Sequence, residues 1–82
     1  MRTKMSSIDK FSLDLHGVYH REVPILVDRF LYEHMLEGSM MINIITGNSD
    51  AMKNIVGKIL DEYGFSYKES LLNSGTIMVV VE

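Results

Sequence analysis

Leu13-Asp14-Leu15-His16-Gly17 has the alternation of a short β-strand that ends on a glycine. Side chains alternate between the two faces of a strand, so Leu13 and Leu15 can enter a core while Asp14 and His16 share the opposite face. The stretch therefore predicts a carboxylate and an imidazole side by side at the end of a strand, with the rest of the chain as the scaffold that holds them.

The length and composition of the chain predict one domain. Its 82 residues are too few for two cores, and a hydrophobic fraction of 46% is enough for one core between two layers. We expect a flexible N-terminal arm at 1–10 and a single folded domain at 11–82. The absence of Cys excludes disulfides, thiolate metal sites and a Cys nucleophile. The N-terminal segment has no apolar run typical of a signal peptide, and no stretch reaches the roughly 20 apolar residues of a membrane span. We therefore expect a soluble, cytoplasmic protein with no membrane partner.

The charge balance limits the kind of nucleic-acid binding that is expected. A net charge of -3 with eight basic residues argues against strong nonspecific binding to a duplex, because that affinity comes mainly from Lys and Arg. A local basic patch remains open, with Arg2, Lys4 and Lys10 in the arm and Arg21 shortly after the first strand. Each of these side chains alone also fits an ordinary solvated position.

The periodicity of the remaining chain predicts the order βαβαββ. In the first predicted strand Phe11 joins the two leucines on the core side, and Pro24 falls in the first turn of the first predicted helix, where its missing N–H costs nothing. Apolar residues at three-four spacing mark both helices, and Gly38 and Gly64 are expected as their C-caps. Right-handed crossovers then place both helices on one face of a four-stranded mixed sheet, which is an α/β (α+β) two-layer sandwich with one open face. The predicted strands are 11–16, 40–46, 65–71 and 76–81, and the predicted helices are 22–37 and a segment that Ser49 or Asp50 caps and that ends near 63.

The first candidate site is the pair Asp14 and His16. The carboxylate would orient the imidazole and stabilise its protonated form, or help hold a divalent metal ion. An Asp-x-His pair also occurs on ordinary polar strand faces, and that alternative stays open.

The second candidate site is Thr46-Gly47-Asn48-Ser49, where a strand runs into the N-terminus of a helix. Free backbone N–H groups and the helix dipole favour an anion such as phosphate there. We expect this loop at the same carboxyl edge of the sheet as His16, which is the usual ligand-binding edge of open α/β sheets. In the alternative interpretation the loop binds no anion: Thr46 is simply the last residue of the strand, and Ser49 only caps the helix.

Three further groups carry weaker signals. His20 follows the first strand closely enough to act as a secondary ligand or a phosphate donor, or it is simply solvated. His34 falls on the buried side of the first helix and is expected to be a hydrogen-bonded histidine at the edge of the core. Met41 and Met78 are expected on the open sheet face, where they would form a patch for a partner.

The motifs in their order resemble one family. Leu13 to Gly17, an amphipathic helix, Ile44-Ile45-Thr46-Gly47, a second helix and Ser74-Gly75-Thr76-Ile77-Met78-Val79-Val80 together resemble the small MutS-related (Smr) domain over residues 11–82. Such domains are similar in fold to the C-terminal domain of bacterial translation initiation factor three, which agrees with βαβαββ.

The resemblance implies work on nucleic acid, because Smr domains include nicking endonucleases on DNA and endoribonucleases on RNA. It implies that Asp14 and His16 are catalytic and that Thr46 and Gly47 form an adjacent phosphate-handling loop. His16 would then activate water or a ribose hydroxyl, and backbone N–H groups would stabilise the phosphoryl oxygens. The neighbouring substrate contacts would be Asn48, Ser49, His20 and Arg21. The expected cofactor is Mg²⁺ or Mn²⁺, with Asp14 as a candidate ligand and no organic cofactor.

The chain departs from the family pattern at one place, and this keeps two other functions open. The family's Thr-Gly-x-Gly usually has a basic residue at x, whereas Asn48 and Ser49 stand at the last two positions here. Loss of that charge and of the second glycine favours a nucleic-acid-binding module without efficient turnover. The other alternative is a protein-interaction domain that forms a homodimer through the open sheet face.

Overall fold

The computed structural model describes residues 10–81, so the predicted arm, except for Lys10, lies outside the described residues. The order of the elements confirms βαβαββ. The elements are β1 (Ser12–Asp14), a short 3₁₀ helix η1 (His20–Glu22), α1 (Val23–Glu37), β2 (Met41–Ile45), α2 (Asp50–Tyr63), β3 (Ser66–Glu69) and β4 (Thr76–Val80).

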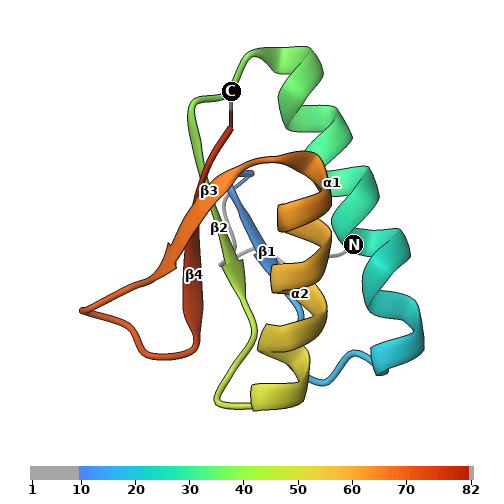
Figure 1. The fold of residues 1–82 in the computed structure, drawn as a ribbon, viewed down its shortest axis with the longest axis vertical. Helices are drawn as coiled ribbons and strands as arrows, with labels where there is room; N and C mark the ends of the chain where they lie inside the picture. Colours follow the sequence, from blue (N-terminus) through green and yellow to red (C-terminus); the bar gives the residue numbers. More distant parts are fainter. Residues whose placement is uncertain (1–9, 82) are drawn as a thin grey trace, which may run out of the picture.

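The four strands form one mixed sheet in the order β1-β2-β4-β3. β1 and β2 are parallel, and β4 lies between β2 and β3 and is antiparallel to both. Figure 1 shows α1 and α2 on the same side of the sheet. The two-layer sandwich with one open sheet face is therefore confirmed, as is the central position predicted for β2.

The core lies between this sheet and the two helices. Inward-facing residues alternate along β2 and β4, whereas Met41 and Met78 lie on the other face of the sheet, as predicted. The predicted inner faces of both helices are buried, with Leu26, Ile55 and Tyr63 only partly so. The largest side chains with no exposed surface are Leu15, Leu31, Ile42, Ile44 and Leu60.

The ends of the helices follow the sequence signals. Pro24 lies in the first turn of α1, and Ser49 caps α2 by accepting a hydrogen bond from the N–H of Met52 at 3.1 Å. Gly38 and Gly64 are the C-caps, both in the left-handed conformation. Both helices therefore begin and end within one residue of the predicted positions.

β1 and β3 are shorter than predicted, and one predicted core residue lies at the rim. β1 ends at Asp14 because the chain turns there, and Phe11 is 41% exposed and packs its ring beside that of His34. β3 is an edge strand of four residues, all of them exposed, and Leu71 beyond it is 97% exposed. No helix within residues 10–81 combines the length and the apolar character needed to cross a membrane.

Candidate active site

The carboxyl ends of β1 and β2 lie side by side. Asp14 is paired with Ile45 in the parallel register, and the N–H of Leu15 donates to the carbonyl oxygen of Ile45 at 2.8 Å. The structure thus brings the Asp14–His16 stretch and the 46–49 loop to one edge of the sheet, at the lower end of the molecule in Figure 1.

The Asp14 carboxylate holds the backbone of His16. The N–H of His16 donates to Oδ1 of Asp14 at 2.9 Å, and the N–H of Val18 donates to the carbonyl oxygen of Leu15 at 3.0 Å. Both side chains of the pair are exposed. The two residues are therefore close because of a turn that follows the strand, and the carboxylate contacts the His16 main chain rather than its ring.

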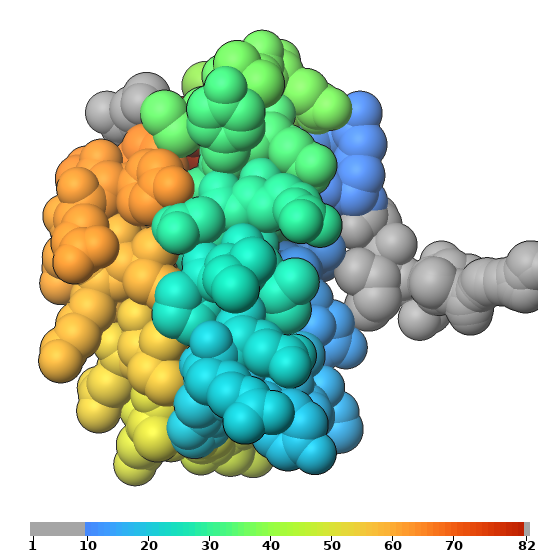
Figure 2. Space-filling model, turned by 90° about the vertical axis from the view of Figure 1, so that its right-hand side faces the viewer, coloured from blue at the N-terminus to red at the C-terminus, as the bar shows by residue number. Residues whose placement is uncertain are grey.

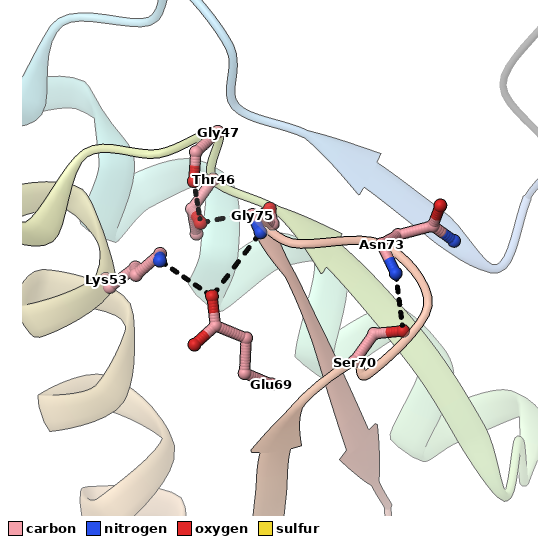
Figure 3. A network of polar contacts seen from close by, with 7 residues as sticks. All are labelled: Thr46, Gly47, Lys53, Glu69, Ser70, Asn73 and Gly75. Carbon is pink, nitrogen blue, oxygen red and sulfur yellow. Dashed lines mark hydrogen bonds and ion pairs between the residues drawn. The ribbon is translucent and has the colours of Figure 1, made fainter.

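The Thr46-Gly47 segment is held from inside by Gly75. The carbonyl oxygen of Gly75 accepts the N–H of Thr46 at 2.7 Å and that of Gly47 at 3.1 Å. The hydroxyl of Thr46 lies 3.1 Å from the same oxygen and 3.0 Å from the carbonyl oxygen of Gly47 (Figure 3). Because Thr46 is only 3% exposed, its hydroxyl shapes the loop from within.

The next two residues of the loop carry the N–H groups that remain for a ligand. The N–H groups of Asn48 and Ser49 make no hydrogen bond to any residue in the described range 10–81. Asp50, the first residue of α2, places a carboxylate at the helix end where the dipole attracts anions. An anion at this edge therefore meets several backbone donors, including first-turn N–H groups of α2, and one opposing charge.

A polar network below the loop includes residues to which the sequence analysis assigned no role. Nζ of Lys53, on α2, lies 2.6 Å from Oε2 of Glu69, at the end of β3, and the N–H of Gly75 lies 3.4 Å from the same oxygen. Figure 3 shows this carboxylate between the two groups. The bond from Lys53, followed by that from Gly75, lowers the pKa of Glu69 below its usual value. The sequence does show a polar residue at the end of a predicted strand and a lysine on a predicted helix. Pairing the two requires knowing which residue of β3 lies opposite which residue of α2.

The predicted substrate contacts His20 and Arg21 lie in η1, between β1 and α1, and both are exposed. Together with Val18 and Tyr19 they line a hollow of about 680 Å³. The guanidinium carbon of Arg21 lies over the Tyr19 ring, 5.4 Å from its centre. Figure 2 shows this blue segment at the lower end of α1, next to the yellow N-terminal part of α2.

His34 is the structural histidine that the sequence indicated. It is 4% exposed, and its ring nitrogens lie 2.7 Å from the Ser39 hydroxyl and 2.8 Å from the Lys10 carbonyl oxygen. The imidazole of His34, on α1, therefore links Lys10, at the start of the described chain, to Ser39, just after α1, by hydrogen bonds.

Within the described part of the chain, the His, Asp and Glu side chains do not form a metal site. Within residues 10–81, no group of three or more His, Asp or Glu side chains is placed to hold a metal ion. Asp14, the metal ligand considered from the sequence, has one carboxylate oxygen on the His16 N–H. The described residues alone therefore do not supply a set of ligands for a metal ion.

Comparison with known proteins identifies the fold. No protein-family model and no curated protein sequence matches the chain. Among solved structures, the solution structure of the B3BP Smr domain superimposes with a TM-score of 0.78 at 24% sequence identity, over 89% of this chain and 79% of that one. The architecture that the Leu-Asp-Leu-His-Gly and Thr-Gly motifs indicated is confirmed, and the chain has the fold of an Smr domain.

Proposed function

We propose that this domain binds nucleic acid and cleaves its phosphodiester bonds, with His16 as the catalytic base. The observation that carries the proposal is that the Asp14–His16 turn and the 46–49 loop follow the paired carboxyl ends of β1 and β2, at one edge of the sheet, in a chain with the Smr fold. An exposed imidazole at the same sheet edge as N–H groups that bond to no residue in 10–81 suits a phosphate ester, which needs a base near the nucleophile and donors on its oxygens.

The chemistry needs few groups. His16 takes a proton from the attacking water or ribose hydroxyl, and the oxygen of that nucleophile bonds to phosphorus while the bond to the leaving oxygen breaks. The leaving oxygen takes a proton from the imidazolium or from solvent. The N–H groups of Asn48 and Ser49 face the phosphoryl oxygens, and Asp14 acts as a positioning residue that fixes the turn carrying His16.

The test compares two exposed histidines of the same segment. We expect His16→Ala to lower cleavage of labelled RNA or DNA by about 10²- to 10⁴-fold with little loss of binding. We expect His20→Ala to weaken binding and to change the rate at saturating substrate little. Single-stranded RNA, supercoiled plasmid and linear DNA are assayed with Mg²⁺, with Mn²⁺ and with chelator. Cleavage that survives unchanged in His16→Ala would show that His16 is not the base.

A binding module without turnover is the second candidate, and the carboxylate of Asp50 beside the loop favours it. It predicts salt-dependent binding to nucleic acid with no cleavage under any of these metal conditions.

A homodimer through the open sheet face is the third candidate, and the exposed apolar residues there favour it. Met41 is 51% exposed and lies beside Met78 and Val80 on that face. This candidate predicts a dimer in sedimentation and no salt-dependent nucleic-acid binding.

A further inference from the structure

The loop between β1 and α1 presents an exposed aromatic ring. Tyr19 is 69% exposed, and although it stands at the N-cap position of η1, its side chain makes no capping hydrogen bond. The ring is instead held at the surface, with Arg21 over it. A large side chain in this position is available to a ligand.

The main chain on both sides of Tyr19 is fixed. The N–H of Val18 donates to the carbonyl oxygen of Leu15 at 3.0 Å, and the carbonyl oxygen of Tyr19 accepts the N–H of Glu22 at 2.9 Å. The ring therefore projects from an ordered turn, and little backbone entropy is lost when a ligand packs on it.

We propose that Tyr19 stacks on an unpaired nucleobase and that Arg21 contacts the adjoining phosphate, so that the substrate class of this site is single-stranded nucleic acid. The inference rests on the proposed function and names the part of the substrate that the site reads. Stacking on aromatic side chains is the main sequence-tolerant contact to single strands, and Arg beside the ring supplies the charge for the backbone.

The position of the Tyr19 ring relative to His16 fits one short stretch of a nucleic-acid strand. Tyr19 follows His16 by three residues, which span at most about 11 Å of chain. The open hollow beside the ring is lined by His20 and Arg21 as well. A base on Tyr19 and a phosphate at His16 therefore belong to neighbouring parts of one strand.

A paired duplex does not satisfy this geometry. The faces of its bases are covered by their neighbours, so an exposed ring on a short turn cannot reach them without unstacking. The overall charge of -3 also disfavours binding that relies on phosphates alone. Stacking supplies the affinity that the charge balance does not.

The chain allows a direct spectroscopic test, because it has no Trp. Tyr19→Trp introduces a single indole at the proposed stacking position, and Tyr32→Trp, at a residue 60% exposed on α1, is the matched control. Both are made in the His16→Ala background, so that the strand is not cut, and are titrated with single-stranded RNA, single-stranded DNA and duplex of one sequence.

We expect single strands to quench the indole fluorescence of the Tyr19→Trp variant and to leave that of the Tyr32→Trp variant unchanged. Comparing the titration with single-stranded RNA and the titration with single-stranded DNA shows which of the two supplies the stacked base. We expect Tyr19→Ala to weaken single-strand affinity about tenfold by anisotropy, and Tyr19→Phe to retain it.

Three other outcomes would contradict the inference in different ways. Binding without quenching in the Tyr19→Trp variant, together with unchanged affinity in Tyr19→Ala, would overturn this inference and leave the proposed function standing. Equal quenching by duplex would overturn the single-strand assignment. Absence of binding to every probe would overturn both proposals.

Discussion

A Cβ atom at Gly75 would lie 2.7 Å from the carbonyl oxygen of Gly47. The Gly47 carbonyl and the Cα of Gly75 both belong to the main chain. Neither can move away without breaking the hydrogen bonds by which the Gly75 carbonyl holds the Thr46-Gly47 segment. The loop before α2 and the loop before β4 are therefore locked to each other at the edge that carries the candidate site.

The first prediction concerns this close approach. We expect Gly75→Ala to lower the free energy of unfolding by at least about 2 kcal/mol, because it adds a backbone clash to the cost of a left-handed alanine at φ +86°. Gly38→Ala has a similar φ of +77° with nothing within 4 Å of the new Cβ, and we expect about 1 kcal/mol there. Urea unfolding measures both. Equal losses would mean that the close approach to Gly47 costs nothing.

The second prediction separates shaping of the loop from contact with substrate at Thr46. We expect Thr46→Val to lower the free energy of unfolding by about 1 kcal/mol, because it removes a buried hydroxyl while the Gly75 carbonyl keeps two N–H donors. Nucleic-acid affinity should stay within about twofold of wild type, since the hydroxyl is turned inward. Thr76→Val, on β4, is the control for the change in composition. A large loss of affinity in a stable Thr46→Val protein would assign the hydroxyl to the substrate.

Local signals were sufficient to predict the elements but not the order of the strands. Gly38, Gly64 and Ser49 each act within a few residues of chain, so the helix ends could be predicted closely. That β4 enters between β2 and β3 depends on pairing across the molecule. The apolar residues of Thr76–Val80 and the polar Ser66–Glu69 are compatible with this order, but they do not specify it.

The candidate site could be located from the sequence, but the way it is held could not. Parallel strands bring Asp14 and Gly47 to one edge by topology alone. The bond from the His16 N–H to the Asp14 carboxylate and the Gly75 carbonyl on the loop depend on turns whose geometry alternation does not describe. The exposure of Tyr19 is likewise a property of the folded turn, and nothing in the residue pattern around it indicates that the ring faces solvent.

The third prediction concerns pH and the Lys53–Glu69 pair. The pKa of Glu69 is lowered, first by the bond from Lys53 and then by the bond from Gly75, so its ionised form stabilises the fold above its usual pKa, and the effect is lost as the pH falls through the lowered value. We expect Glu69→Gln to be less stable than wild type at pH 7 and the difference to shrink below about pH 4. Urea midpoints measured at several pH values show this. Glu62→Gln, at an exposed helical position, is the control, and a difference that does not depend on pH would contradict the role of the charge.

The fourth prediction concerns the tautomer of His34. A carbonyl oxygen only accepts hydrogen bonds, so the 2.8 Å contact to Lys10 requires the proton on Nε2, and in the neutral ring Nδ1 accepts from the Ser39 hydroxyl. Long-range ¹H–¹⁵N correlation spectra should show the Nε2–H tautomer. His34→Leu should lower the free energy of unfolding by about 2 kcal/mol, because two polar partners lose their bonds. A spectrum of the Nδ1–H form would contradict this arrangement.

The fifth prediction distinguishes two roles of Asp14. If its carboxylate acts by holding the His16 turn, an amide oxygen can accept the same N–H at 2.9 Å, whereas alanine cannot. We expect Asp14→Asn to keep cleavage within about tenfold of wild type and Asp14→Ala to lose about 10²-fold or more. Amide chemical shifts of His16 and Gly17 report the turn independently of activity, and they should change in Asp14→Ala alone. If Asp14→Asn keeps those shifts but is as inactive as Asp14→Ala, the negative charge itself acts on the reaction, and the positioning role is wrong.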